Sequence, residues 1–393
     1  CMHVLGVART EVRVMRAATA LADAGLSVSI VDVESEQAPG VEEIMHDIKV
    51  KHVKMPDSFL SLRFKHRTFM HAAQLFMRSL IALMQTPADM YHAHNAAALP
   101  ACYIAARLCR KPLIFEAHEL PLSDLHFSEM GRSRRFMNKL LSILVPLMVS
   151  YCAGVITVSP PIAEEMRKRY SIAEVTLLRN IPPYQAISRC DRLRQHLGLG
   201  SNVRIALYQG NLQPDRGLDR LVRAAAFLER DSVIVMMGKD KVATRGQLEA
   251  LIENEGMAER VKVMPPVPYE ELLNWTASAD IGLTVIPLDY TLNMRWALPN
   301  KFFEYLMAGL PVLSSPLDAV SEIITTYKVG RIVPSLAPAD IGAAINAMLA
   351  DSAELAVMRH NALSVAQQEF HWEKERQKLT RLYDDVLARQ QVK

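Results

Sequence analysis

Residues 298–312 read LPNKFFEYLMAGLPV, and this stretch is the most informative in the chain for both fold and function. Asn300 is a favourable N-cap residue, Gly309 suits the left-handed conformation that ends a helix, and a proline follows two residues later. The spacing therefore predicts a short helix over residues 301–308, with a buried strand directly after it. Glu304 is one of few charges in this apolar helix. Its carboxylate could accept hydrogen bonds from two ribose hydroxyls, or it could interact with the dipole near the helix start.

The rest of the chain alternates short apolar runs with helical patterns. In the second half, strands are predicted at 203–208, 233–237, 261–264, 281–286 and 312–314, with helices at 218–228 and 270–277. In the first half, strands are predicted at 4–7, 28–33, 90–93, 112–115 and 154–158, with helices at about 14–22 and 99–108. Strands that alternate with helices in this order form parallel sheets buried between helices.

A stretch rich in proline, serine and glycine separates the two halves, around residues 182–200. We therefore predict an α/β protein of two doubly wound, Rossmann-like domains that face each other across a cleft, with the active site in that cleft. The N-terminal domain is placed at residues 1–185 and the C-terminal domain at 186–368, and a final helix follows within 369–393.

Composition excludes several classes of protein. The chain has 393 residues, a length that fits two domains. Hydrophobic residues make up 50% of it and charged residues 22%, a composition typical of a packed fold rather than a disordered chain. A formal net charge of +3 is too small to predict nucleic acid as the partner. Five scattered cysteines form no C-x-x-C pair, which favours a reducing, cytoplasmic compartment over a disulfide framework or a zinc ribbon. The first residues read as a strand rather than a signal peptide.

Two long stretches, 58–88 and 130–163, contain no acidic residue. Basic side chains lie among apolar ones there, and this pattern suits the surface of an anionic membrane. Amphipathic core helices with a solvated basic rim would give the same pattern, and both interpretations stay open. The basic residues concerned are Arg63, Lys65, Arg67, Arg132, Arg134, Arg135 and Lys139.

Residues 208–218, YQGNLQPDRGL, place a glycine at a strand end and an Arg-Gly pair before a helix. Gly210 would let the backbone approach a ligand closely, and free N–H groups at a helix start favour phosphate. Arg216 could add a bidentate contact to phosphate oxygens. An ordinary strand-to-helix turn with a solvated arginine is the competing interpretation.

Two further segments place ionisable side chains at strand ends. Residues 114–120 read IFEAHEL, and His118 there could donate a hydrogen bond to a ligand from a ring nitrogen. Residues 92–95 read HAHN, and the two histidines share a face of a strand. A metal site would need a third ligand, which the sequence does not locate, and we predict none.

Together these segments resemble the retaining glycosyltransferases of family 4 (glycosyl transferases group 1 type), which have the GT-B fold. Residues 91–95 and 115–119 are similar to the family's "HAHD" and "DAHE" segments, with Asn95 in place of the common Asp. Residues 208–217 are similar to its phosphate loop, and residues 299–311 to its "PNKxFEYMAxGxPV" signature, the most specific motif in the chain. The resemblance continues at 156–159, at 179–182 and at 370–373, where the closing helix of the family often packs back on the N-terminal domain.

The resemblance implies a reaction: transfer of a hexosyl or N-acetylhexosaminyl group from a nucleoside-diphosphate sugar to a hydroxyl of a glycan or lipid-linked acceptor. It implies a UDP- or GDP-sugar as co-substrate, no metal or other cofactor, and a role in bacterial surface polysaccharide synthesis at the inner face of the membrane. The catalytic residues implied are His118, Arg216 and Lys301. The donor-binding residues implied are Gly210, Asn211, Arg216, Gly217, Gly238, Asn300, Lys301 and Glu304, and those on the acceptor side are Asn95 and Glu119.

Two departures from the family pattern keep alternatives open. Trp296 stands where many members have the first Glu of an E-x7-E pair, and Asn211 stands where a second basic residue is common. These substitutions support a catalytically silent, membrane-associated scaffold of a glycan assembly complex. A non-hydrolysing nucleotide-sugar epimerase would need acid/base carboxylates, for which Glu116 and Glu119 are available. The 299–311 signature argues against the epimerase.

Overall fold

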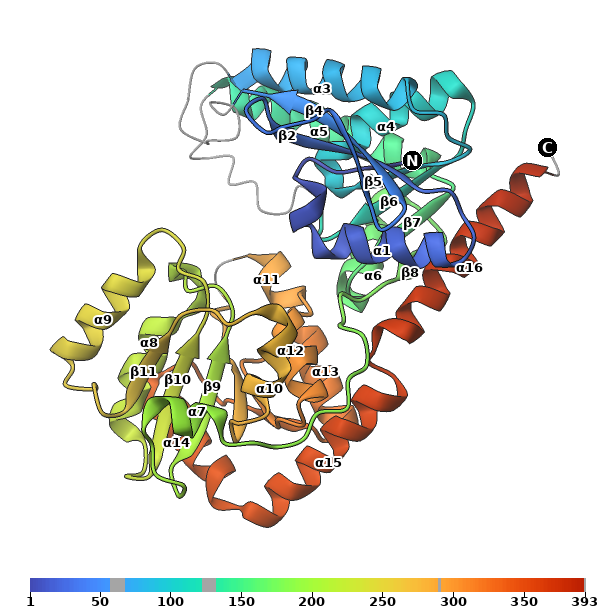
Figure 1. Cartoon of the computed structure of the whole chain (residues 1–393). Helices are drawn as coiled ribbons and strands as arrows, with labels where there is room; N and C mark the ends of the chain where they lie inside the picture. The colour runs from blue at the N-terminus through green and yellow to red at the C-terminus, as the bar shows by residue number, and fades with distance from the viewer. Residues whose placement is uncertain (57–67, 122–131, 289–290, 392–393) are drawn as a thin grey trace. The chain divides into compact units, whose positions relative to one another are not determined.

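The computed structural model describes residues 1–56, 68–121, 132–288 and 291–391 (Figure 1). The chain divides into two compact units. The first unit consists of residues Cys1–Arg179 together with Glu375–Lys393, and the second unit consists of residues Asn180–Lys374. Each unit is built on its own, mainly parallel sheet, so the predicted pair of α/β domains is confirmed.

The sheet of the first unit has eight strands in the order β3-β4-β2-β1-β5-β6-β7-β8. Neighbouring strands are parallel except β3 and β4, which form an antiparallel pair at one edge. The strands are β1 Met2–His3, β2 Ser29–Ser35, β3 Glu42–Met45, β4 Ile48–Met55, β5 Tyr91–His94, β6 Leu113–Ala117, β7 Gly154–Thr157 and β8 Thr176–Leu177. The helices are α1 Val12–Asp23, α3 Thr68–Met84, α4 Asn95–Cys109, α5 Arg132–Tyr151, α6 Pro160–Tyr170 and α16 Trp372–Gln391.

Two predicted boundaries in this unit are wrong. The first strand ends at His3 rather than spanning 4–7, and the helix predicted from residue 99 begins at Asn95. Asn95 directly follows the strand end with a φ of 69°, a left-handed conformation that asparagine tolerates better than most residues. The three alanines after it favour helix, so the helix forms one turn earlier than the pattern predicted.

The sheet of the second unit has six parallel strands in the order β11-β10-β9-β12-β13-β14. The strands are β9 Arg204–Gln209, β10 Ser232–Met237, β11 Val261–Met264, β12 Ile281–Thr284, β13 Val312–Ser314 and β14 Gly330–Ile332. The chain builds outward from β9 in one direction and then returns to place β12 on its other side. Such a reversal is where open α/β sheets bind ligands, at the carboxyl ends of the two central strands.

Helices flank this second sheet on both faces, and two apolar clusters form its core. The helices are α7 Arg192–Leu197, α8 Leu218–Ala224, α9 Thr244–Asn254, α10 Leu272–Thr276, α11 Leu292–Trp296, α12 Asn300–Met307, α13 Asp318–Tyr327, α14 Pro338–Ala350 and α15 Ser352–Gln368. The helix predicted at 218–228 ends at Ala224 and continues as a 3-10 turn over Ala225–Phe227.

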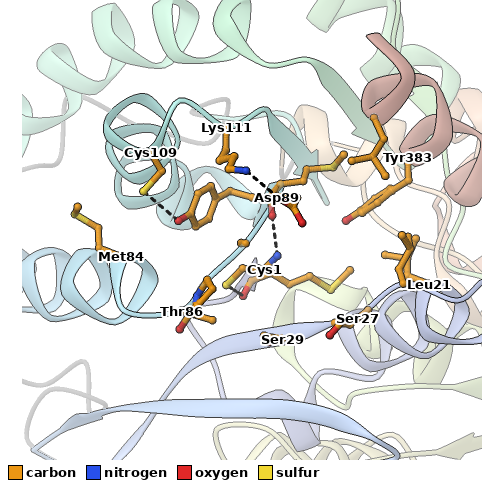
Figure 2. Close-up of a pocket in the computed structure, with 18 residues that line it drawn as sticks. Cys1, Leu21, Ser27, Ser29, Met84, Thr86, Asp89, Cys109, Lys111 and Tyr383 are labelled. Carbon is orange, nitrogen blue, oxygen red and sulfur yellow. Dashed lines mark hydrogen bonds and ion pairs between the residues drawn. The ribbon is translucent and has the colours of Figure 1, made fainter. Parts of the chain in front are cut away.

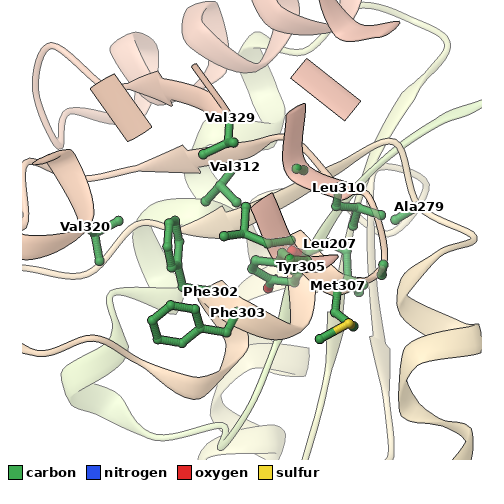
Figure 3. Packing of buried hydrophobic residues seen from close by; sticks show 14 of the residues in the cluster. Leu207, Ala279, Phe302, Phe303, Tyr305, Met307, Leu310, Val312, Val320 and Val329 are labelled. Carbon is green, nitrogen blue, oxygen red and sulfur yellow. Dashed lines mark hydrogen bonds between the residues drawn. The ribbon is translucent and has the colours of Figure 1, made fainter. Parts of the chain in front are cut away.

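Helix α12 is the element predicted from residues 298–312, and it buries almost every side chain that it carries (Figure 3). Pro299 is the N-cap and Asn300 is the first helical residue, so the assignment of Asn300 as N-cap is wrong by one position. The prediction for the other end is confirmed: Gly309 has a φ of 68°. The N–H of Gly309 bonds to the carbonyl of Leu306 at 3.0 Å, and that of Leu310 to the carbonyl of Tyr305 at 2.8 Å. This pair of bonds is the Schellman motif.

Helix α16, red in Figure 1, is remote in sequence from the first unit but belongs to it from Glu375 onward. The buried carboxylate of Glu375 accepts hydrogen bonds from the backbone N–H of Arg179 at 2.8 Å and from its guanidinium at 3.1 Å. The hydroxyl of Tyr383 lies 2.8 Å from Nδ1 of His92 on β5.

Among the described helices, no single one is long and apolar enough to cross a membrane. The helices Pro338–Ala350 and Ser352–Gln390 are long and apolar enough only when they are taken together, and they are bent by 90° relative to each other.

Candidate active site

Two glycines bring the ends of strands β9 and β10 into backbone contact in the second unit. Gly210 follows β9 with a φ of 130°, and Gly238 follows β10. A Cβ atom on Gly238 would lie 1.6 Å from the carbonyl oxygen of Gly210, which no side chain can accommodate. Both positions therefore require glycine. Gly210 is exposed and lies beside Lys301, because a Cβ on Gly210 would be 3.6 Å from Nζ of that residue.

Lys301 is a buried cation in the first turn of α12. Its Nζ lies 3.7 Å from the ring centroid of Tyr208, and no described residue accepts a hydrogen bond from it. Burial lowers the pKa of Lys301 to about 7; the charge of Arg216 acts in the same direction and that of Glu304 in the opposite one. The ring face of Tyr208 compensates the charge only in part. A buried ammonium group with no acceptor favours binding of an anion at this place.

Glu304 is held by a short network of polar side chains in the second unit. Its side chain accepts a hydrogen bond at 2.6 Å from the amide nitrogen of Gln209, whose amide oxygen accepts one at 2.7 Å from the hydroxyl of Thr276. The residue is only 8% exposed. The hydroxyl of Tyr305 accepts from the backbone N–H of Gln209 at 3.0 Å and fixes the strand end. Glu304 thus presents a carboxylate in a defined orientation at the edge where β9 ends.

Arg216 lies in the 3-10 turn Pro214–Arg216 that precedes Gly217 and α8. Its side chain is 31% exposed, and its guanidinium lies 3.7 Å from the carboxylate of Asp215. Gly217 has a φ of 68°, and a Cβ there would lie 3.0 Å from Pro287. The positive charge of Arg216 acts to lower the pKa of Lys301 and to oppose the burial that raises the pKa of Tyr208.

The second unit therefore gathers most of the predicted donor-binding residues around the ends of β9 and β10. Asn300 is one residue before Lys301, and Asn211 is exposed, with its carbonyl accepting a hydrogen bond from Tyr208 at 2.9 Å. Gln209 and Thr276 were not predicted. A polar residue directly before the strand-end glycine was the only sequence signal for Gln209, and the pairing with Thr276 depends on tertiary structure.

His118, the predicted catalytic histidine, lies in the first unit just after β6. Its backbone N–H donates to Oδ1 of Asn95 at 3.3 Å, and its Nε2 lies 3.1 Å from Oε1 of Glu116. Glu119 is exposed on the same turn. Two of the three predicted residues of this unit, His118 and Asn95, are therefore in contact, at the carboxyl ends of β5 and β6.

Glu116 is fully buried beneath His118 and forms an ion pair with Arg13 of α1. Burial alone would raise the pKa of Glu116, but the charges of Arg13 and the adjacent histidines hold it well below its usual range. The rings of His92 and His94 stack at 4.2 Å next to it, and burial lowers the pKa of both. Ligand atoms of His92, His94 and Glu116 lie within 4.8 Å of one another, a spacing that a metal ion could use.

Trp296, which replaces the expected Glu, ends helix α11 in the second unit. Its indole N–H donates to Oδ2 of Asp318 at 3.0 Å, while Arg295 binds Oδ1 of the same carboxylate at 3.0 Å. The indole is therefore tied to the first residue of α13. No carboxylate is supplied by the chain at position 296, and Asp318 is already paired with two donors.

A cavity of about 630 Å³ lies elsewhere in the first unit, at the amino ends of β1, β2 and β5 (Figure 2). Cys1, Tyr91 and Tyr383 line it, together with the ion pair of Lys111 and Asp89 at 2.9 Å. His118 and Glu116 lie at the opposite, carboxyl ends of the strands. None of the predicted site residues lines this cavity, so it is distinct from the candidate active site.

Comparison with known proteins agrees with this geometry. Residues 10–181 match the family described as Glycosyltransferase Family 4, and residues 191–365 match Glycosyl transferases group 1. The chain is 29% identical over 207 residues to D-inositol 3-phosphate glycosyltransferase 1 of Catenulispora acidiphila, covering 50% of this chain and 48% of that protein. It is 23% identical over 382 residues to the D-inositol 3-phosphate glycosyltransferase of Jonesia denitrificans, covering 92% and 88%. The chain thus spans about half the length of the former and most of the latter.

Solved structures share the fold across the whole chain. Sucrose-phosphate synthase from Thermosynechococcus elongatus has a TM-score of 0.78 at 16% identity, and the alignment covers 98% of each chain. Anabaena HepE in complex with UDP-glucose has a TM-score of 0.71 at 16% identity, again covering 98% of each chain. WaaG, a glycosyltransferase involved in lipopolysaccharide biosynthesis, has a TM-score of 0.68 at 16% identity, covering 97% of this chain and 98% of that one.

The chain therefore belongs to the glycosyltransferases of GT-B fold, of the group 1 and family 4 type. The recognition and the fold class predicted from the sequence are confirmed.

Proposed function

We propose that this glycosyltransferase moves a sugar from UDP to a hydroxyl of a glycan or lipid-linked acceptor, with retention of anomeric configuration and without a metal ion. The observation that carries the proposal is Lys301, a buried ammonium group with no described acceptor, on whose pKa the charges of Arg216 and Glu304 both act. These groups offer two positive charges for a diphosphate and one carboxylate for a neighbouring diol. The structure of a relative by fold, Anabaena HepE, in complex with UDP-glucose supports UDP rather than another nucleotide.

The chemistry follows from where charge develops. As the bond between the sugar and the diphosphate breaks, negative charge grows on the leaving phosphate. Arg216 and Lys301 would stabilise that charge, and the effect would be strong because their surroundings are partly or wholly shielded from water. Glu304 would accept hydrogen bonds from the ribose hydroxyls, and His118 would contact the transferred sugar. We propose that the acceptor hydroxyl bonds to the anomeric carbon on the face from which the phosphate leaves, and that the leaving phosphate takes the proton of this hydroxyl. Attack on that face retains the configuration.

Calorimetric titration with UDP tests the donor pocket. Arg216→Ala is expected to weaken UDP binding roughly 10- to 100-fold, because one charge-assisted contact is lost. Glu304→Gln is expected to weaken the binding of UDP more than the binding of 2′-deoxy-UDP, since only UDP has both ribose hydroxyls. Arg223→Ala is the matched control, since Arg223 is a solvent-exposed arginine on α8 that pairs with Asp219. Unchanged UDP affinity in both site variants would overturn the pocket.

Turnover tests the reaction itself. A panel of UDP- and GDP-sugars with glycan and lipid-linked acceptors, assayed with and without a chelator, is expected to give a product of unchanged anomeric configuration at the same rate in both conditions. Epimerised donor formed without acceptor would support the epimerase instead. Donor binding without transfer to any acceptor would support the scaffold.

We also propose that the enzyme works in the cytoplasm at an anionic membrane surface, in the synthesis of bacterial surface polysaccharide. Support comes from two helices of the first unit, α3 and α5, which carry no acidic residue. They expose the apolar side chains of Met77, Ile81, Met84, Ile143, Leu144 and Leu147. Lys139 of α5 is exposed as well. Arg63, Lys65 and Arg67 lie outside the described residues, as do the side chains of Arg132, Arg134 and Arg135.

Flotation with vesicles of anionic lipid tests the membrane surface. The wild-type chain is expected to float with these vesicles and less with neutral ones, and added salt should weaken the association. Ile143→Glu together with Leu147→Glu is expected to abolish flotation. Val357→Glu is the control, because Val357 is an equally exposed apolar residue (58%) on a helix of the second unit. Equal flotation of all three proteins would contradict the proposal.

A further inference from the structure

Glu116 is completely buried at the carboxyl end of β6, and each of its carboxylate oxygens lies close to a nitrogen-bearing side chain. Oε1 accepts from the guanidinium of Arg13 and lies 3.1 Å from Nε2 of His118. Oε2 lies 3.3 Å from Nε2 of His92. Arg13 is itself anchored, because its second nitrogen donates to the carbonyl of Leu178 at 2.9 Å. Two hydrogen bonds therefore hold Oε1, while Nε2 of His92 approaches Oε2 without forming a hydrogen bond in this structure.

The contacts of His118 determine which ring nitrogen carries the proton. A carboxylate can only accept, so Nε2 of His118, facing Oε1 of Glu116, must be protonated. Nδ1 has no partner among the described residues, and the side chain is 21% exposed. In a neutral ring Nδ1 is therefore the acceptor, and in a charged ring it is a donor. The backbone bond to Asn95 holds the main chain of the same residue.

The same logic extends to the C-terminal helix. Nε2 of His92 faces the other carboxylate oxygen and so carries its proton, which leaves Nδ1 to accept the hydroxyl proton of Tyr383 at 2.8 Å. The opposite tautomer would set a ring lone pair against an anionic oxygen. A continuous row of contacts therefore joins Tyr383 on α16 through His92 and Glu116 to His118.

We propose that Glu116 is a positioning residue, which holds His118 with Nε2–H directed inward and Nδ1 directed at the ligand, and that Tyr383 and His92 hold Glu116 from the opposite side. The role of His118 at the sugar rests on the proposed function, whereas the tautomer does not. A metal ion bound by His92, His94 and Glu116 is the competing arrangement. It is disfavoured because Arg13 already balances the charge of Glu116.

Histidine tautomers can be read directly in the full-length chain labelled with ¹⁵N-histidine, by long-range proton–nitrogen correlation at pH 8. The His118 signals are assigned by their loss in His118→Gln. The wild type is expected to show protonated Nε2 and unprotonated Nδ1 in both His118 and His92. A protonated Nδ1 in His118 overturns the proposal whether or not any variant folds. A metal ion bound in a one-to-one ratio, detected by elemental analysis, would also overturn the proposal if it abolishes the His92 signals and a chelator restores them.

Glu116→Gln keeps the shape but adds an amide donor, so His118 is expected to populate both tautomers. If the wild type shows turnover, kcat of Glu116→Gln is expected to fall on the order of 10- to 100-fold, with the KM for the donor unchanged. Glu116→Asp is expected to recover part of the lost kcat. Glu164→Gln, an exposed carboxylate on α6, is the control. An unaltered His118 tautomer together with unaltered kcat in Glu116→Gln refutes the positioning role. The expected tautomers without turnover on any donor would support positioning while refuting the proposed reaction.

Discussion

Lys301 carries a charge that is costly in the empty protein and that, in the proposed function, stabilises a bound diphosphate. Its ammonium group is buried against the ring of Tyr208 and has no described hydrogen-bond acceptor. The pKa falls from an ordinary 10.5 to about 7 as a result of burial. Because the folded state binds this proton less tightly than the unfolded state does, the charged lysine lowers the free energy of unfolding.

Replacing Lys301 by methionine is therefore expected to stabilise the empty protein while weakening UDP binding. At pH 7 and below, both folded and unfolded states carry the charge and the gain is largest, on the order of a few kcal/mol. Between pH 7 and 10.5 the wild type itself gains stability, since its folded state has lost the proton, so the difference shrinks. Melting temperatures at pH 6, 8 and 9.5 measure this. Lys374→Met, at an exposed lysine, is the control. A difference that is constant with pH would contradict the assignment.

Diphosphate binding is expected to draw a proton onto Lys301. At pH 8 the empty site holds a mostly neutral amine, and an adjacent anion raises its pKa. Calorimetry of UDP binding in buffers of different ionisation enthalpy should show that the complex takes up nearly one proton for each UDP bound. Lys301→Arg, whose guanidinium stays charged, should bind UDP with less uptake. Binding heats that do not depend on the buffer would show that Lys301 is already protonated.

The residues of the site were predictable to different degrees. Glu304 and Arg216 were located from local motifs, because a helix start and a glycine-rich strand end are encoded by adjacent residues. Lys301 was located only through the resemblance of residues 299–311 to the family signature. Gln209, which orients Glu304, and Arg13, which neutralises Glu116, were not predicted. Gln209 pairs with a residue 67 positions away and Arg13 with one 103 positions away. No local pattern encodes such a pairing.

At the scale of elements, helix α12 connects the proposed donor site to the core of the second unit. Its first turn supplies Lys301, while the opposite end is fixed by Gly309 in the left-handed conformation. Its identity and its end were predictable from the cap chemistry, and its start was missed by one residue. The start of the helix depends on Pro299. This residue is the N-cap, its φ is fixed by the ring at −69°, and it makes no side-chain hydrogen bond to the helix.

Gly309→Ala is expected to destabilise the protein more than Gly256→Ala. Both glycines have a φ of 68°, so each substitution pays a similar backbone penalty of about 1–2 kcal/mol. A Cβ at Gly309 would also lie 2.9 Å from Leu363 on α15, whereas a Cβ at Gly256 has nothing within 4 Å. Urea unfolding measures the difference. Equal losses would mean that α15 shifts to accommodate the methyl group.

At the scale of the whole molecule, the first unit is discontinuous in sequence. Two Rossmann-like halves were predictable from the alternation of strands and helices. Residues from Glu375 onward complete the first unit. Their place in it is shown by the contact of Glu375 with Arg179 and by that of Tyr383 with His92. The helix pattern of this last segment resembles any surface helix, so its place in the first unit could be expected only from a resemblance to a known family.

Fragments test this organisation. Residues 180–374 alone are expected to unfold cooperatively and to bind UDP. Residues 1–179 alone leave Arg179 without the carboxylate of Glu375 and are expected to be poorly packed, with weak near-ultraviolet circular dichroism. Adding residues 375–393 through a flexible linker should restore the signal. A fragment 1–179 with the stability of the linked form would show that α16 is dispensable.

The same discontinuity sets the order of events on the ribosome. Residue 179 is synthesised 196 positions before Glu375, which at roughly 5–20 residues per second is a delay of about 10–40 seconds. During this interval the nascent N-terminal half has no Tyr383 beside His92 and no Glu375 beside Arg179. The half that is translated first is therefore the last to mature, and chaperones would meet it in that unfinished form.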